Sequence, residues 1–166
     1  MKSVFGILLI LALASLGLIV AGQVGLLTGR TPKNIGVVDG KLSPPCGTPN
    51  SVSSQADLFP NHPQRKYSKI APFSYSGDAG AAMQKLAVVL ASMAGTVVVK
   101  NEADYIYAQS STPLMHFTDD LEFWLDHANN TIQVRSASRI GRSDFGQNRK
   151  RMESIRESFN RTRQVT

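Results

Sequence analysis

The residues best suited to chemistry lie in one short segment of the sequence, which reads HFTDDLEFWLD. It brings one imidazole, His116, close to three carboxylates, Asp119, Asp120 and Glu122. Adjacent carboxylates can bind a divalent cation or act as general acid and base, and an imidazole can activate a nucleophile. A metal site needs three or more convergent ligands, which this strand alone does not supply. We therefore predict no metal, no cofactor and no catalytic residue, and keep a hydrolase-type use of these four residues as the alternative.

The same segment has the alternation of a β-strand, in which successive side chains point to opposite faces. Leu121, Phe123 and Leu125 would form the core face, and Asp119 shares that face with them. A carboxylate in an apolar row has to lie at a strand end or be paired. We expect Asp119 or Asp120 to form an ion pair with an arginine of the following strand, because cross-strand charge pairs stabilise antiparallel sheets.

The net positive charge of the chain is confined to its C-terminal part. Nine Lys/Arg and three Asp/Glu lie between Arg135 and Arg163, whereas residues 1–134 contain nine of each. Glu153 and Glu157 interrupt the basic run, and the interleaved aromatic residues of a base-stacking surface are missing. We therefore predict no nucleic-acid partner.

Residues 139–144 (RIGRSD) lead into a predicted helix N-terminus, where exposed backbone N–H groups can receive an anion. The residues that could hold an anionic small molecule or a lipid headgroup there are Arg135, Arg139, Arg142, Asn148 and Arg149. In the competing structural interpretation, Asp144 caps the same N–H groups and the arginines pair with Asp119, Asp120 and Glu122. Both interpretations stay open at this point.

Helical and strand patterns predict the elements that position these groups. Apolar residues recur at helical spacing after Asp78, a suitable N-cap, and the pattern stops at Gly95. Four strand-like segments then follow one another across short turns. Their ranges are 96–100, 105–110, 115–126 and 131–138.

A second helix is predicted near the C-terminus. It starts near Asp144, which stands three residues before Gln147 as in a capping box. Its apolar stripe consists of Phe145, Met152, Ile155 and Phe159. Because consecutive strands with short turns pair antiparallel, we predict an α+β fold in which a four-stranded antiparallel meander is covered by an N-side helix and a C-terminal helix.

An uncharged stretch from Val4 to Gly22 precedes this domain. At about 1.5 Å per residue, its length approaches a hydrocarbon core of roughly 30 Å. It is also longer than the usual signal-peptide core of about 7–15 residues. We therefore predict a single-pass signal anchor over residues 1–27, with the globular domain on the non-cytoplasmic side of the membrane. The alternative is a cleaved signal peptide with a small-residue site ending at Gly22, which would leave a secreted or periplasmic protein.

The remaining chain divides into a linker, 28–41, and a globular domain, 42–166. Residues 28–64 are rich in Pro, Gly, Ser and Asn and are predicted to be irregular, with 42–56 held against the core. Cys46 is the only cysteine, so the chain contains no internal disulfide, and we expect this side chain to serve in packing.

Three segments resemble an uncharacterised family, number 1499 among the domains of unknown function. They read LSPPCGTPNSVSSQA, HFTDDLEFWLD and RSASRIGRSDFGQNRKR. The resemblance implies that most of residues 36–160 form one domain, and it implies no activity or ligand. The first motif of the family usually contains two cysteines, whereas Pro45 and Ser51 stand at those places here. Any disulfide or dithiol role that the family suggests therefore does not apply to this chain.

These observations together predict a membrane-anchored or exported protein of the cell envelope. Its domain is expected to be a non-enzymatic binding or structural module for an anionic or amphiphilic ligand.

Overall fold

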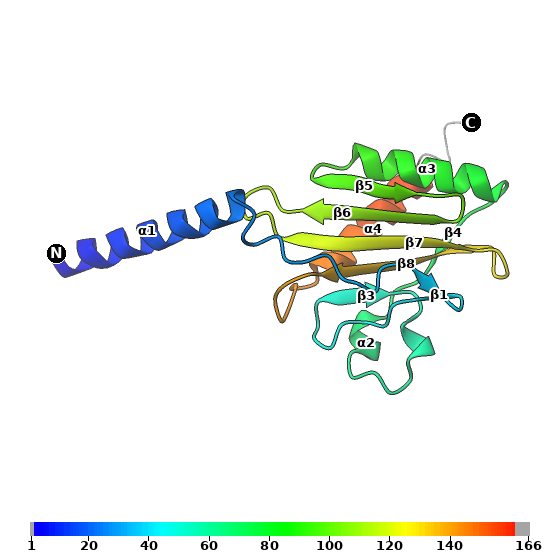
Figure 1. Ribbon diagram of the computed structural model, residues 1–166, viewed down its shortest axis with the longest axis horizontal. Coiled ribbons are helices and arrows are strands. Elements are labelled where there is room, and N and C mark those ends of the chain that lie inside the picture. The colour runs from blue at the N-terminus through cyan, green and yellow to red at the C-terminus, as the bar shows by residue number, and fades with distance from the viewer. Residues whose placement is uncertain (1, 162–166) are drawn as a thin grey trace.

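A computed structural model of the protein describes residues 2–161, in which a long helix projects from an α+β domain (Figure 1). The helix is α1, Lys2–Gln23. In the described part of the chain it is the one helix long and apolar enough to cross a membrane, and the 18-residue stretch that meets this criterion is unburied. The predictions that include Met1 or residues 162–166, among them the charge of Arg163, lie partly outside the described residues.

One six-stranded antiparallel sheet forms the centre of the domain. Its order is β3-β8-β7-β6-β5, and β4 also pairs with β8. The strands are β3 Ser51–Ser53, β4 Phe73–Ser74, β5 Thr96–Asn101, β6 Tyr105–Ser111, β7 Thr118–Asp126 and β8 Thr131–Ser138.

The predicted α+β class and the antiparallel pairing are confirmed, but the predicted count of four strands is wrong. The two additional strands, β3 and β4, come from segments without a regular pattern. They contain three and two residues, which is too short for a period of two to be visible in the sequence.

Two helices, α3 Ala79–Ser92 and α4 Gln147–Arg161, pack on one face of the sheet (Figure 1). Asp78 caps α3 by accepting a hydrogen bond of 2.7 Å from the backbone N–H of Ala81. Core side chains from both helices meet those of the central strands, and they include Leu86, Leu90, Leu121, Phe123, Val134, Met152 and Ile155.

Residues 35–42 cross the other face of the sheet. They contain the two-stranded ribbon of β1 (Val37–Val38) and β2 (Lys41–Leu42). Leu42 is buried against Tyr105 and Tyr107. Along the chain, two short helices come after this ribbon and before α3. They are the 3₁₀-helix η1 (Ala56–Leu58) and α2 (Arg65–Ser68). The second half of the predicted linker 28–41 is therefore packed on the sheet.

The predicted apolar stripe of the last helix is wrong at Phe145. The helix begins only at Gln147, and Phe145 lies in the preceding turn with a φ of 51° and 91% of its surface exposed. The other three members of the stripe, Met152, Ile155 and Phe159, are buried in the core. A left-handed backbone at a bulky residue leaves no trace in hydrophobic periodicity.

Candidate functional site

Two carboxylates of the acidic strand lie buried on the sheet face that residues 35–42 cover. Glu122 Oε2 contacts Arg135 Nη1 at 3.0 Å, and these two residues are direct partners across β7 and β8. Asp120 receives two parallel hydrogen bonds from Arg139, from Nε to Oδ2 at 3.0 Å and from Nη2 to Oδ1 at 2.8 Å. Both carboxylates are fully buried, so each needs the arginine beside it.

Two tyrosines from β6 complete this row of ion pairs. Tyr105 donates its hydroxyl to Glu122 Oε1 at 2.9 Å, and Tyr107 donates to Asp120 Oδ1 at 2.6 Å. Burial, with the adjacent carboxylates, raises the pKa of both phenols, so they act as neutral donors. The backbone N–H of Gly36 donates to Glu122 Oε1 at 2.8 Å. The carboxylates of this row therefore have their charge and hydrogen-bonding capacity taken up within the domain.

A second polar cluster lies at the N-terminus of α4. The carboxylate of Asp144 accepts hydrogen bonds from the backbone N–H groups of Gly146 (3.0 Å) and Asn148 (2.9 Å) and from the Tyr67 hydroxyl (2.6 Å). Burial alone would raise the pKa of Asp144, but these donors outweigh it and hold that pKa below its usual value. A protein carboxylate thus occupies the position that an anion would take.

Asn148 connects this cap to the sheet. Its amide nitrogen donates to the carbonyl of Asn50 at 3.0 Å and to the hydroxyl of Ser138 at 2.9 Å. The hydroxyl of Ser136 donates to the amide oxygen of Asn148. Asn148 is fully buried, and its amide is committed to these internal partners.

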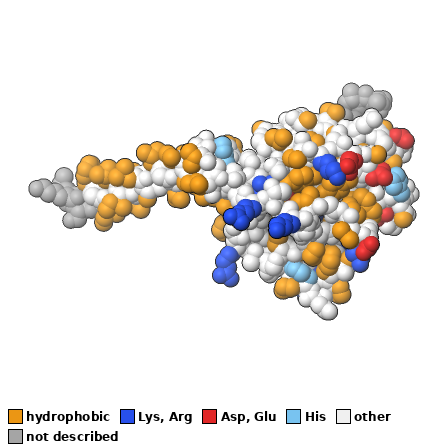
Figure 2. All heavy atoms as spheres, in the orientation of Figure 1, with side chains coloured by type: hydrophobic (Ala, Val, Ile, Leu, Met, Phe, Trp, Pro, Cys, Tyr) orange, Lys and Arg blue, Asp and Glu red, His pale blue; other side chains and the backbone are white. Residues whose placement is uncertain are grey.

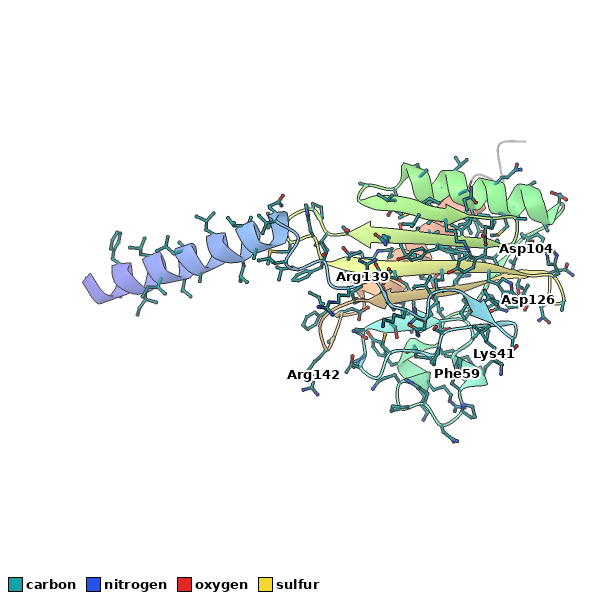
Figure 3. All side chains as sticks on the ribbon, in the orientation of Figure 1. Lys41, Phe59, Asp104, Asp126, Arg139 and Arg142 are labelled. Carbon is teal, nitrogen blue, oxygen red and sulfur yellow. The ribbon has the colours of Figure 1, made fainter. Side chains whose placement is uncertain are left out.

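The other two predicted anion-binding arginines lie apart from the ion-pair row. Arg149 donates to the backbone carbonyls of Tyr67 and Lys69, which fastens α4 to α2. Arg142 is exposed and points away from the domain (Figure 3). The structure therefore places Arg135, Arg139, Arg142, Asn148 and Arg149 in four different environments and does not bring them together in one cleft.

Asp119 lies on the helix-covered face of the sheet, opposite to Asp120 and Glu122. Its Oδ2 is 2.6 Å from Nη2 of Arg151 on α4. The role of Arg151 was missing from the sequence prediction, which looked for a partner on the next strand. The spacing of Arg151 could have indicated this role. Arg151 stands three residues after Asn148 and four before Ile155, which places it on the face of α4 that meets the sheet.

A cavity opens beside this ion pair, at the end of the sheet where β7 begins and β8 ends. It has a volume of about 370 Å³. Phe117, Ile140 and Phe145 provide apolar walls, and Asp119, Asp144 and Arg151 provide the charged groups. We call this cavity the sheet-end pocket.

The four residues of the hydrolase alternative do not share a cavity. His116 lies in the turn before β7 with a φ of 51° and lines a different depression, together with Gly95 and Thr96. Of these four residues, only Asp119 lines the sheet-end pocket. Asp120 and Glu122 lie on the opposite face of the sheet. Within residues 2–161, no group of three or more His, Cys, Asp or Glu side chains is placed to hold a metal ion.

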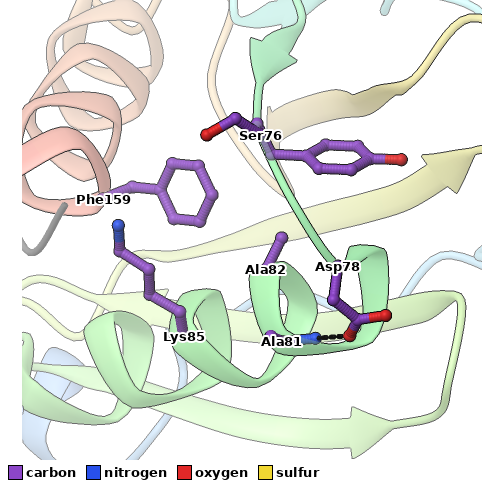
Figure 4. A pocket seen from close by; sticks show the side chains of 7 residues that line it. Ser76, Asp78, Ala81, Ala82, Lys85 and Phe159 are labelled. Carbon is purple, nitrogen blue, oxygen red and sulfur yellow. Dashed lines mark hydrogen bonds between the residues drawn. The ribbon is translucent and has the colours of Figure 1, made fainter. Parts of the chain in front are cut away.

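A smaller cavity of about 140 Å³ lies between α3 and the end of α4 (Figure 4). Lys85 and Phe159 both line this cavity, and the Lys85 ammonium lies over the Phe159 ring, 4.7 Å from its centre. Asp78, the one carboxylate in its lining, is used to cap α3. This cavity is therefore a less suitable site than the sheet-end pocket.

Comparison with known proteins identifies the domain that carries these features. A family model described as a protein of unknown function (DUF1499) matches residues 41–159. The chain belongs to the DUF1499 family. The matched region contains the ion-pair row, the Asp144 cap and the sheet-end pocket, whereas α1 precedes it. No curated protein and no solved structure matches the chain.

Proposed function

We propose that this DUF1499 protein is a membrane-anchored, non-enzymatic binding module of the cell envelope that holds an amphiphilic ligand in the sheet-end pocket. The observation that carries the proposal is the composition of the pocket. Phe117, Ile140 and Phe145 form apolar walls, and the charged groups of the lining are the Asp119–Arg151 ion pair and the Asp144 carboxylate, which caps α4. Such a lining suits a molecule with an apolar tail and a polar head.

The environment of the charged groups supports this ligand class over a free anion. Arg135 and Arg139 are already neutralised by buried carboxylates, and Asp144 occupies the helix N-terminus. A free anion would have to displace one of these internal partners. In the sheet-end pocket, by contrast, an acidic headgroup can approach Arg151, whose side chain is 15% exposed, while its tail contacts the walls.

The same environments disfavour the hydrolase alternative. A general acid or base has to reach its substrate and to lie within hydrogen-bonding distance of the proton that it transfers. Asp120 and Glu122 are fully buried in ion pairs, and His116 faces a different depression. We therefore keep the binding module as the one proposed function.

The location proposed for the domain rests on α1. The span Val4–Gln23 can anchor the chain as a single-pass helix, with the globular domain on the non-cytoplasmic side. Cleavage near Gly22, which would leave a secreted or periplasmic protein, is the alternative location. The ligand-binding proposal is the same in both cases, because the pocket lies entirely within residues 112–151.

The proposal can be tested with a dansyl-labelled fatty acid and the full chain held in amphipol. We expect saturable binding that Gln147→Trp weakens at least tenfold, because Gln147 is exposed and lines the pocket, so a Trp side chain there would fill it. Ser154→Trp is the matched control, since Ser154 is exposed on the same helix and does not line the pocket. Equal binding by both variants, or no saturable binding by the unmodified chain, would contradict the proposal.

A further inference from the structure

Exposed apolar side chains gather on the loops at the end of the sheet nearest α1. The loop between β6 and β7 exposes Leu114 and Phe117, and the loop between β8 and α4 exposes Ile140 and Phe145. Val24 and Leu26, directly after α1, are 66% and 75% exposed. We call these six residues the apolar rim. Grouped exposure of large apolar residues marks an interaction surface, whereas single exposed residues are ordinary.

The position of Phe145 is fixed by its neighbours. Its left-handed backbone costs a bulky residue of the order of 1 kcal/mol. The turn is nevertheless held on both sides, because the Asp144 carboxylate accepts the backbone N–H groups of Gly146 and Asn148. The phenyl ring is thereby presented outward, with 91% of its surface exposed.

The apolar rim is continuous with the end of the membrane helix. Gln23 donates its side-chain amide to the carbonyl oxygen of Leu114 at 3.0 Å. A Cβ atom on Gly22 would lie only 2.6 Å from the carbonyl oxygen of Met115, so α1 and the β6–β7 loop are in close contact. A membrane that contains α1 would therefore have its surface at the level of this loop.

The charges around the rim also favour a membrane surface. On the face seen in Figure 2, Lys and Arg side chains gather where α1 joins the domain, and Asp and Glu lie toward the opposite end. Figure 3 places Arg142 at the end nearest α1 and Asp104 and Asp126 at the far end. The two carboxylates near the rim, Asp119 and Asp144, are buried and have internal partners. Each basic residue close to an anionic bilayer contributes about 1 kcal/mol to its binding.

We propose that the apolar rim inserts into the interface of the same bilayer that contains α1, as a second membrane contact that fixes the orientation of the domain. Phe145 and Ile140 would enter the acyl-chain boundary, and Arg142 would meet anionic headgroups. The sheet-end pocket shares Phe117, Ile140 and Phe145 with the rim, so it would open toward lipid. The second contact does not depend on whether the pocket binds a ligand.

The test places an environment-sensitive NBD label at Phe145→Cys or, separately, at Ile140→Cys. The full chain carries Cys46→Ser as well and is reconstituted into vesicles of phosphatidylcholine and phosphatidylglycerol. Ala128→Cys, in the exposed turn between β7 and β8, is the control. We expect spin-labelled acyl chains to quench positions 140 and 145 several-fold more than position 128, and aqueous iodide to show the opposite order.

Iodide quenching of positions 140 and 145 as strong as that of position 128 would overturn the proposal. A label shielded from both quenchers would have turned into the sheet-end pocket, and this outcome also overturns it. The quenching reports the depth of the rim in the bilayer and not occupancy of the pocket, so its result and that of the fatty-acid titration can differ. Two independently labelled positions keep the test informative if one variant does not fold.

Discussion

Arg151 and Asp119 join the last helix to the central sheet, with 2.6 Å between Nη2 and Oδ2 at the edge of the sheet-end pocket. The two side chains are 15% and 9% exposed, so the pair lies between the core and the sheet-end pocket. Arg151 also donates to the amide oxygen of Asn148 at 3.2 Å. The ion pair and the cap of α4 are therefore connected through Arg151 and Asn148, and both adjoin the sheet-end pocket.

We expect Asp119→Asn and Arg151→Gln each to lower the free energy of unfolding by about 1–3 kcal/mol, because each leaves a largely buried group without its partner. The double variant should cost less than the sum of the two. Urea unfolding of the full chain in detergent, followed by the fluorescence of Trp124, measures both quantities. Asp57→Asn is the control, since its ion pair with Lys69 is exposed and screened by solvent, so its removal should change stability little. Additive effects of the two substitutions would contradict a direct interaction.

Glu122→Gln should loosen the segment that covers the sheet. The substitution removes the carboxylate that accepts from both Arg135 and the backbone N–H of Gly36. We expect a loss of about 3–5 kcal/mol in stability, because Arg135 is left as a buried unpaired charge. The amide of Gly36 should also exchange with deuterium faster than in the unmodified chain. Glu102→Gln, at an exposed pair with Lys100, should change neither quantity appreciably. Unaltered exchange at Gly36 in the Glu122 variant would refute this coupling.

The cap formed by Asp144 predicts a dependence of stability on pH. Its pKa in the folded protein lies below the usual 3.8, so its charge stabilises the fold above that pH. This contribution is lost as the pH falls from 3.8 through the lower folded value. Asp144→Asn should cost about 1–2 kcal/mol at neutral pH, and the difference from the unmodified chain should shrink in acid.

Urea unfolding at a series of pH values measures this difference. Tyr67→Phe removes one of the donors to the carboxylate and should reproduce part of the pH effect. A difference that is constant from neutral pH to below 3.8 would exclude Asp144 as its source.

Phe145→Asn should make the domain more stable while weakening the proposed contact of the apolar rim with the membrane. Asn tolerates a left-handed backbone better than Phe, and the lost ring makes little contact because it is 91% exposed. We expect a gain of about 0.5–1 kcal/mol in urea unfolding. Leu114→Asn, an exposed apolar residue without a positive φ, should give no such gain. A loss of stability in the Phe145 variant would show that the ring is needed for folding.

The parts of the fold that the sequence predicted are those with long periodic patterns. The alternation of Leu121, Phe123 and Leu125 predicted β7 and its buried face, and Asp78 and Gly95 marked the limits of α3. By contrast, β3 and β4 are held by pairing with β8, which is a long-range contact with no local pattern. Their formation depends on the core that the other elements build.

The site was harder to predict than the fold, for two physical reasons. Partners such as Asp119 and Arg151 meet only when α4 packs on the sheet. The angle of that packing cannot be predicted from the sequence of β7 or of α4 alone. The outward direction of Phe145 follows from one backbone torsion, whereas its apolar character alone placed it in the core. Both deviations from the sequence prediction lie at the sheet-end pocket, where local preferences and the folded structure disagree.

The contact between Gly22 and Met115 also limits when α1 could be removed. A protease that cleaves after a small residue needs the chain around that bond to be extended and accessible. In the folded protein α1 continues to Gln23, Gly22 is buried and its backbone lies against the carbonyl of Met115. Removal of α1 at this position would have to take place before the β6–β7 loop closes over it. For the proposed location on the non-cytoplasmic side, the time at which the domain folds would then decide whether the mature protein keeps α1.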